Sequence, residues 1–367
     1  MPHSVREQSH KLRLLTGFPP MPVKKVRNIL SVMAVTVGLF AGASQSAMAA
    51  AVKIGYIPVL GSSALFVIDG EGWAKQAGID LEPVRFTSGP QAIQALASGR
   101  IDAYVAGVVP LLQVRARGVD VKVVASGAIE ELSVIARGPL AADLDPSKPG
   151  GLTKEQVAER IAAFTKTHGR KPKIATQPSG SVPDTVLRYW LQEKEAIDLS
   201  AVDIVGIDID AAQQAFLAGA VDAAILREPA LTTIKNRFPD TRVLATGHDL
   251  IPDQPGSVLA IVSPSSPDHA VWAGKLTSLF VKATTLLADH PDQAAPFVAT
   301  ALGGGLLKPA IIEQALKASS AQFVADPARI IPSVKILQDF QIKEGVLKKA
   351  TPVDDLFDLQ LWRQPAP

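Results

Sequence analysis

Four short loops hold the residues whose chemistry best suits a small ligand. Each loop follows an apolar run typical of a strand and precedes a segment typical of a helix, and the candidate binding residues in these loops are Ser62, Ser63, Ser88, Gly89, Gln91, Ser179, Gly180, Ser181 and Asp208. The start of a helix presents free backbone N–H groups and a partial positive charge, which favour an anion. We therefore expect these loops to bind the acidic group of a small solute.

The same residue types have a simpler interpretation, which the sequence leaves open. Ser and Gly before a helix are also ordinary caps and turn residues. Asp208 occupies the place in its loop that Ser88 takes in another, which makes it a candidate for contact with a ligand amine. Glu228 either faces the ligand or forms a surface ion pair with its neighbour Arg227.

Patterns typical of catalysis or metal binding are missing from the sequence. The chain has no cysteine, which excludes a thiol nucleophile and a metal bound by cysteine. Its six histidines show no spacing typical of a metal site, and no Ser-His-Asp arrangement stands out. We predict no catalytic residue, no metal and no cofactor.

An internal repeat positions the candidate loops. Lys53-Ile54 recurs about 120 residues later as Lys173-Ile174, and a Gly-x-x-Asp-Ala turn with Asp102 recurs with Asp222. Each copy shows the order strand, helix, strand, helix, strand. We interpret the two aspartates as residues that cap backbone N–H groups rather than as ligand contacts.

The alternation of short strands and helices predicts an α/β fold with two lobes and a ligand cleft between them. Strands joined by helices form parallel βαβ units that are covered on both faces. We assign residues 50–138 and 259–367 to lobe 1 and residues 139–258 to lobe 2. A strand at Leu132–Arg137 is expected to leave lobe 1, and a strand at Val258–Val262 is expected to return to it.

The first 49 residues are typical of an export signal. Lys24, Lys25 and Arg27 precede an apolar run over Ile29–Ala43, and Ala47-Met48-Ala49 fits a signal-peptidase site. The apolar run is shorter than the ~20 residues that a membrane-spanning helix needs. We expect this signal peptide to be cleaved and the protein to be soluble in the periplasm.

Removal of the signal peptide changes the charge of the protein. The whole chain has a formal net charge of +2, and residues 1–49 carry six Lys or Arg side chains against one Glu. The mature chain therefore has a net charge of about −3 by difference. No basic stripe with interleaved aromatic residues follows the signal, so no nucleic-acid partner is predicted.

Motifs along the mature chain resemble one known family. The segments that carry the resemblance are Lys53–Pro58, Ser88–Ala103, Gly107–Leu112, Gly180–Leu187, Phe216–Pro229 and Phe340–Leu361. With these segments in this order, the chain resembles the nitrate, taurine and alkanesulfonate solute-binding family of ABC importers. The resemblance covers essentially the whole mature chain.

The resemblance implies a type II periplasmic-binding fold that closes on its ligand. It also implies delivery of a small-molecule ligand to an ABC permease and its ATPase, and we expect the protein to be a monomer. In the family, loops matching Ser88–Gln91 and Ser181 hold the acidic group of the ligand. Gly107 lies in a matching segment, and Glu228 matches a frequent acid of the cleft. Sulfonate binders often carry Trp where this chain has Arg227, so the identity of the solute stays open.

Two other classes of function occur on similar folds. An enzyme similar to thiamin-pyrimidine synthase is the main alternative, but that group looks cytoplasmic and uses a Cys-rich motif with His. A regulatory ligand-sensing domain would follow a DNA-binding helix-turn-helix. This chain begins with an apparent export signal and has no cysteine, which favours a binding protein over an enzyme.

Overall fold

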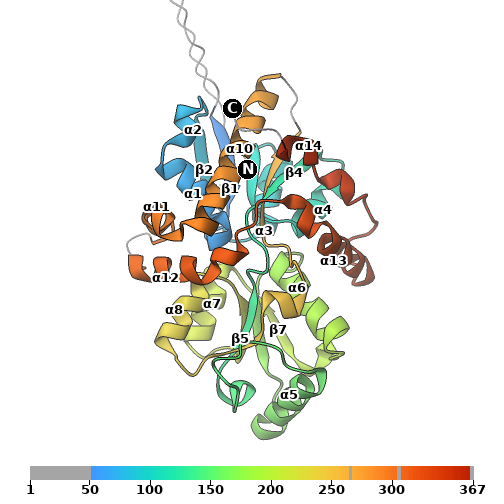
Figure 1. The fold of residues 1–367 in the computed structure, drawn as a ribbon. Coiled ribbons are helices and arrows are strands. Elements are labelled where there is room, and N and C mark those ends of the chain that lie inside the picture. The colour runs from blue at the N-terminus through green and yellow to red at the C-terminus, as the bar shows by residue number, and fades with distance from the viewer. Residues whose placement is uncertain (1–50, 264–266, 304–306, 364–367) are drawn as a thin grey trace, which may run out of the picture. The chain divides into compact units, whose positions relative to one another are not determined.

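The computed structural model describes residues 51–263, 267–303 and 307–363. The predicted signal peptide, residues 1–49, and its cleavage site lie outside the described residues. The described residues form two five-stranded sheets with helices packed around them (Figure 1). The predicted α/β fold with two lobes is confirmed.

The first sheet has the strand order β2-β1-β3-β10-β4. Its strands are β1 (Val52–Tyr56), β2 (Leu81–Arg85), β3 (Ala103–Gly107), β4 (Val121–Ser126) and β10 (Ser257–Val262). β1 is parallel to β2 and β3, whereas β10 is antiparallel to both of its neighbours, β3 and β4. The carboxyl ends of β1, β2, β3 and β4 therefore meet at one edge of this sheet.

The second sheet repeats this arrangement with the order β7-β6-β8-β5-β9. Its strands are β5 (Ser133–Ala136), β6 (Lys173–Thr176), β7 (Asp203–Gly206), β8 (Ala223–Leu226) and β9 (Arg242–Ala245). β6 is parallel to β7 and β8, and β5 is antiparallel to β8 and β9. Each sheet thus has one antiparallel strand in the same place.

The internal repeat is confirmed by the register of the strands and by one hydrogen bond. Ile54 pairs with Ala103 in the first sheet, and Ile174 pairs with Ala223 in the second. The carboxylate of Asp102 accepts from the backbone N–H of Lys53 at 2.9 Å, and that of Asp222 accepts from the N–H of Lys173 at 2.8 Å. Both aspartates are therefore capping residues, as their repeated position predicts.

The chain passes from one sheet to the other twice. Val258–Val262 was predicted as the returning strand and lies within β10 of the first sheet. The strand predicted at Leu132–Arg137 as part of lobe 1 corresponds to β5, which pairs in the second sheet instead. The crossing segments are therefore residues 127–132 and 246–256. Pairing partners are distant in the sequence, so an apolar run predicts a strand but not its sheet. The lobe boundaries at residues 138 and 258 stay predictions.

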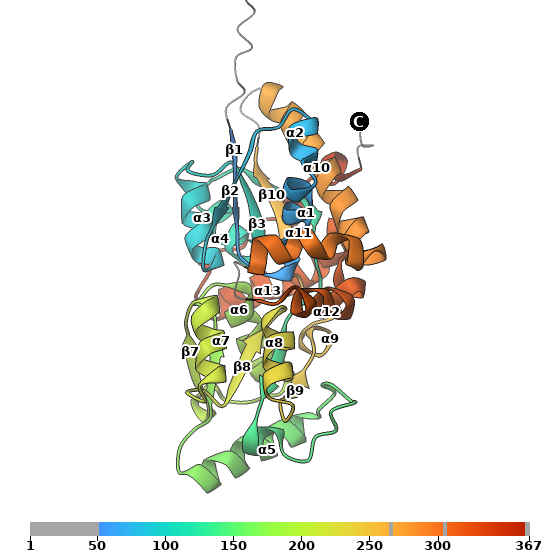
Figure 2. The ribbon, with the colours of Figure 1, turned by 90° about the vertical axis from the view of Figure 1, so that its left-hand side faces the viewer.

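Helices pack on the faces of both sheets. Around the first sheet lie α1 (Ser63–Gly70), α2 (Trp73–Gln76), α3 (Gly89–Ala97), α4 (Val109–Ala116), α10 (Pro267–Asp289), α11 (Pro291–Gly303) and α14 (Leu359–Trp362). Around the second lie α5 (Lys154–His168), α6 (Val182–Tyr189), α7 (Ile209–Leu217), α8 (Ala230–Arg237) and α9 (Gly247–Leu250). In both ribbon views α12 (Pro309–Ser319) and α13 (Ile331–Lys343) lie between the two sheets (Figures 1 and 2).

One buried apolar cluster is continuous between the lobes. It includes Leu111 of α4, Val182 and Leu187 of α6, and Leu337 of α13. Each fully buried side chain of this size contributes about 1.5–3 kcal/mol relative to an exposed one. The contact between the lobes therefore has an apolar core of its own.

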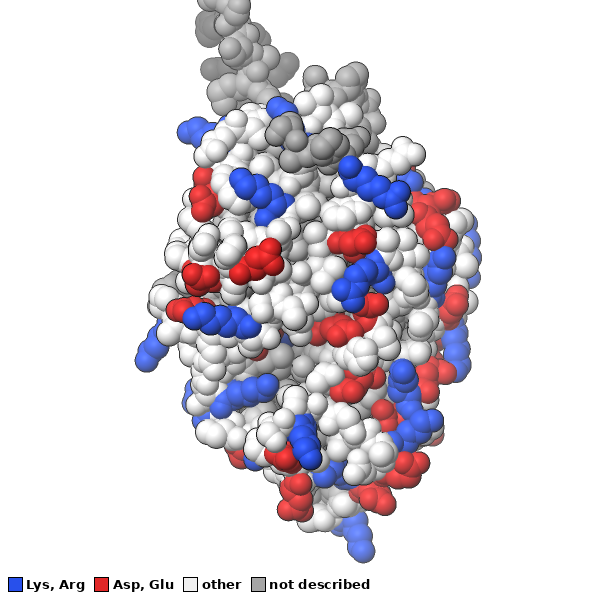
Figure 3. Space-filling model, viewed as in Figure 1, with Lys and Arg blue, Asp and Glu red and all other residues white. Residues whose placement is uncertain are grey.

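The surface carries both signs of charge. On the face shown in Figure 3, Lys and Arg side chains are interspersed with Asp and Glu side chains. None of the described helices combines the length and the apolar character needed to cross a membrane.

Candidate functional site

Two glycines allow the lobes to approach closely where β3 and β6 end. A Cβ atom placed on Gly107, the last residue of β3, would lie 2.5 Å from Cγ2 of Val182, the first residue of α6. Gly180 has a φ of +82°, and its carbonyl accepts a hydrogen bond from Nε2 of Gln113 in α4 at 3.3 Å. The first glycine is needed for space, and the second for its backbone conformation. Two predicted site residues thus lie at the contact between the lobes.

The start of α3 lies against the other lobe. Ser88 occupies the N-cap position of α3, is 1% exposed, and makes no capping hydrogen bond with its side chain. The carbonyl of Thr87 accepts from the N–H of Ile209, the first residue of α7, at 3.5 Å. A Cβ atom on Gly89 would lie 3.3 Å from the hydroxyl of the buried Tyr104. Ser88 and Gly89 are therefore buried next to the point where the start of α3 meets the other lobe.

Ser181 acts as the cap of α6. Its hydroxyl accepts from the N–H of Asp184 at 3.3 Å, and its carbonyl accepts from the hydroxyl of Thr185 at 2.9 Å. Burial raises the pKa of the Asp184 carboxyl, against the opposing effect of Arg188 at 3.0 Å. Ser181 is 1% exposed, so a capping role and contact with a ligand at the junction are compatible.

Ser62 and Ser63 differ in how their hydroxyl groups are used. The Ser62 hydroxyl donates to the carbonyl of Ile57 at 2.8 Å, which fixes the loop after β1. The Ser63 hydroxyl is fully buried and has no hydrogen-bond partner among the described residues. Ser63 is therefore the better candidate for a ligand contact, because a buried hydroxyl without a partner is costly.

Three other predicted residues are less enclosed. Gln91 is exposed, and its side-chain oxygen accepts from the Thr87 hydroxyl at 2.8 Å. Ser179 is exposed as well, although it lies next to the buried Gly180. Asp208 is half-buried at the N-cap of α7 without a capping hydrogen bond from its side chain. The structure does not bring these three side chains into the buried part of the junction.

Two hydroxyl groups that the sequence analysis missed occupy equivalent places. Ser126 is the last residue of β4 and Thr176 is the last residue of β6, and both hydroxyls are buried without a partner among the described residues. With Ser63, which follows β1, they lie at the carboxyl ends of parallel strands in both sheets. A polar residue at the end of an apolar run was the signal that could have found them.

A buried ion pair at the junction was also missed. Nη1 of Arg227 donates to Oε1 of Glu131, and the two side chains are 3% and 7% exposed. The Ser257 hydroxyl donates to the same carboxylate oxygen at 3.3 Å. Burial raises the pKa of the Glu131 carboxyl, and the Arg227 guanidinium opposes this effect. No local pattern predicts the pair, since its members are 96 residues apart.

Glu228 does not pair with Arg227, so that interpretation of the sequence was wrong. Its carboxylate accepts from the N–H and the hydroxyl of Thr232, each at 2.9 Å, and its backbone carbonyl accepts from the N–H of Leu60 at 3.1 Å. Burial raises the pKa of this carboxyl, and the hydrogen bonds from Thr232 lower it. Glu228 therefore joins the end of β8 to the loop after β1.

The cavity beside Glu131 and Glu228 is small. It has a volume of about 10 Å³ and is lined by Leu60, Gly61, Ala128, Glu131, Glu228, Ser319, Gln322 and Phe323. That volume is close to the minimum for one water molecule, roughly 10–15 Å³. A larger solute therefore enters this junction only when the lobes move apart.

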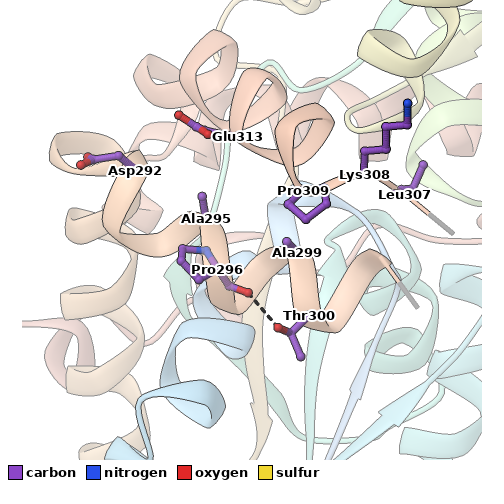
Figure 4. A pocket seen from close by; sticks show the side chains of 9 residues that line it. All are labelled: Asp292, Ala295, Pro296, Ala299, Thr300, Leu307, Lys308, Pro309 and Glu313. Atoms are coloured by element: carbon purple, nitrogen blue, oxygen red, sulfur yellow. Dashed lines mark hydrogen bonds between the residues drawn. The ribbon is translucent and has the colours of Figure 1, made fainter. Parts of the chain in front are cut away.

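A much larger cavity lies away from the strand ends. It is an open groove of about 780 Å³ between α11 and α12, with Asp292 and Glu313 near one end and Lys308 near the other (Figure 4). Its middle is formed by small or apolar side chains, including Ala295 and Pro296 (Figure 4). The groove does not contain any residue of the predicted site. In the part of the chain that the structure describes, no group of three His, Cys, Asp or Glu side chains is placed to hold a metal.

Sequence comparisons link the chain to known binding proteins. A family model described as the NMT1-like family matches residues 45–302. A binding protein of Brucella abortus is 27% identical over 204 residues, which are 55% of this chain and 56% of that protein, so the match spans only about half of the relative. A Bacillus subtilis protein named for binding aliphatic sulfonates is 25% identical over 304 residues, 81% of this chain and 82% of its own length.

Solved structures of similar fold agree with these matches. The periplasmic nitrate-binding protein NrtA of Synechocystis PCC 6803 superposes with a TM-score of 0.69 and 16% sequence identity. The superposition covers 85% of this chain and 87% of that protein. The arrangement of two α/β sheets described above is therefore the fold of a known periplasmic binding protein.

Proposed function

Since the chain belongs to the NMT1-like family, we propose that it is the solute-binding component of an ABC importer, which captures a small anionic solute in the periplasm and delivers it to a permease. Two relatives that resemble it are named for aliphatic sulfonates and for nitrate, which are small anions. The resemblance found in the sequence agrees with this family membership.

The buried hydroxyl groups without partners carry this proposal. Ser126 and Thr176 end β4 and β6, and Ser63 begins α1 after the loop that follows β1. The hydroxyls of all three have no partner among the described residues. Open α/β sheets bind ligands in the crevice beyond these strand ends. Hydroxyl donors from both sheets, together with the starts of α3 and α6, provide an environment for an oxyanion.

Movement at the two crossing segments gives the solute access. Residues 127–132 and 246–256 are the connections that pass directly between the sheets. Separation of the lobes exposes Ser88 and Ser181 from opposite sides, and closure surrounds the solute. In this proposal the protein acts as a monomer and reaches the periplasm through its cleavable signal peptide.

A binding role fits the chain better than an enzymatic one. The relatives with which it aligns are named as binding proteins. Their names favour capture of a solute without chemical change, which is the role proposed for this chain.

Thermal unfolding of the mature protein, residues 50–367, tests the proposal. Nitrate, methanesulfonate, taurine, acetate and neutral sugars form the panel, and at least one anion should raise the melting temperature. A ligand at 100 times its dissociation constant adds about 2.7 kcal/mol to the free energy of unfolding. Ser88→Ala should reduce the shift, whereas the exposed Ser98→Ala should not. A protein stabilised only by neutral solutes would contradict the proposal.

A further inference from the structure

Arg227 brings a guanidinium group to the carboxyl ends of strands from both sheets. It directly follows β8, and its partner Glu131 is also bonded to the Ser257 hydroxyl. Ser257 begins β10 opposite Gly107, the last residue of β3. The guanidinium therefore lies in the crevice where α/β sheets of this type bind ligands.

The ion pair of Arg227 and Glu131 is incomplete. Oε2 of Glu131 and Nε of Arg227 are both buried and have no hydrogen-bond partner among the described residues. A guanidinium group matches a carboxylate best through two parallel hydrogen bonds. A buried pair is stable only when its remaining donors and acceptors are satisfied. This pair therefore leaves an unused donor on a buried cation at the junction.

The Glu131 carboxylate occupies space beside a predicted binding loop. A Cβ atom on Gly61 would lie 2.2 Å from Oε2 of Glu131 and 2.3 Å from the Ser257 hydroxyl oxygen. Glu131 belongs to the crossing segment 127–132, whereas Arg227 directly follows β8 of the second sheet. Its carboxylate therefore stands between the loop after β1 and the guanidinium.

We propose that Arg227 binds the acidic group of the solute, and that the Glu131 carboxylate takes this place on the guanidinium until a solute replaces it. The inference rests on the proposed function and adds the residue that recognises the charge. Displacement of Glu131 frees Nη1, which with Nη2 forms the end-on fork of the guanidinium and can make two parallel hydrogen bonds to one anion. The solute is then an anion with two acceptor oxygens on one atom, such as a nitrate, carboxylate or sulfonate group.

Neutralisation of Glu131, whose carboxylate competes with the solute for Arg227, gives the sharpest test. Nitrate, methanesulfonate and acetate are titrated by calorimetry into the wild-type mature protein and into Glu131→Gln. The substitution keeps the shape of the side chain and removes its charge. At least one of the three anions should bind the variant ten times more tightly or better. A role of Glu131 in folding alone gives no such gain.

Variants of the cation separate ligand binding from stability. Arg227→Met should weaken the same anion at least tenfold, and Arg227→Lys should recover part of the affinity through its charge. Glu131→Met with Arg227→Met replaces the pair by apolar side chains of similar length, a change that buried ion pairs often tolerate. This double variant should melt like the wild type and still fail to bind the anion.

Two results would overturn the inference. One is a double variant that binds as tightly as the wild type. The other is a Glu131→Gln protein without a gain in affinity for any of the three anions, which includes the case in which neither protein binds them. Mass spectrometry of a solute that copurifies with the wild-type protein tests the proposed function independently of Arg227. If an anion copurifies with the wild type and the Arg227 variants still bind it, the proposed function holds and Arg227 is not the residue that recognises the anion.

Discussion

Substitution of Gly107 by alanine should hold the two lobes apart. The new Cβ atom would lie 2.5 Å from Cγ2 and 3.2 Å from Cβ of Val182 across the junction. Val is stiff about its first side-chain torsion, so it cannot turn away easily. Overpacking of this kind costs about 1–3 kcal/mol, which corresponds to a population shift of roughly 5-fold to 150-fold. Binding of the solute should weaken by a similar factor, because the clash opposes only the closed arrangement.

Spin-label distances measure this opening directly. The chain has no cysteine, so Glu71→Cys and Lys235→Cys introduce a single label in each lobe at exposed positions. Gly107→Ala should shift the distance distribution to longer values. Val182→Ala removes the methyl groups that clash with the new Cβ atom. The double variant Gly107→Ala, Val182→Ala should therefore return toward the wild-type distances, because the effects of two residues in contact are coupled. Wild-type distances and affinity in Gly107→Ala would refute the argument that this contact closes the cleft.

Three further predictions concern single sites. Ser63→Ala should weaken solute binding by about 1–3 kcal/mol with little change in melting temperature. Ser62→Ala should instead lower the free energy of unfolding by about 1 kcal/mol, because its internal hydrogen bond is lost. Equal effects of the two substitutions on the melting temperature would contradict this difference. The hydrogen bond with Glu130 raises the pKa of His248 above its ordinary value of 6.5. The protonated His248 therefore contributes fully to the stability of the fold below pH 6.5, and this contribution is lost as the pH rises through the higher folded-state pKa. Urea unfolding should show this loss in the wild type and not in His248→Gln. Mass spectrometry of the exported protein should find an N-terminus at or within a few residues of Ala50, and retention of the apolar segment would exclude the signal peptide.

The order of strands and helices could be predicted because it is encoded locally. Short apolar runs followed by Pro58 and Pro178, about 120 residues apart, place β1 and β6 at equivalent positions. Lys53, the second residue of β1, and Lys173, the first residue of β6, donate their backbone N–H groups to equivalent aspartates, so the repeat in the sequence is a repeat in space. The sheet to which β5 belongs could not be predicted, because its partners β8 and β9 are distant in the sequence.

The candidate site was only partly predictable for the same reason. Ser88 and Ser181 stand at helix starts, which local sequence identifies, and both are buried at the junction. Side-chain direction is not local, so the exposure of Gln91 and Ser179 could not be foreseen. The pairing of Arg227 with an acid on a crossing segment depends on how the two lobes meet, and the adjacent Glu228 was the more obvious partner in the sequence.

A crystal structure of the mature protein with a bound anion from the screen shows where the solute lies. We expect density for the anion between the two sheets, within hydrogen-bond distance of the Ser63 hydroxyl and the Arg227 guanidinium, with the start of α3 or α6 against it. Density in the groove between α11 and α12, with the junction unchanged, would contradict the proposed site.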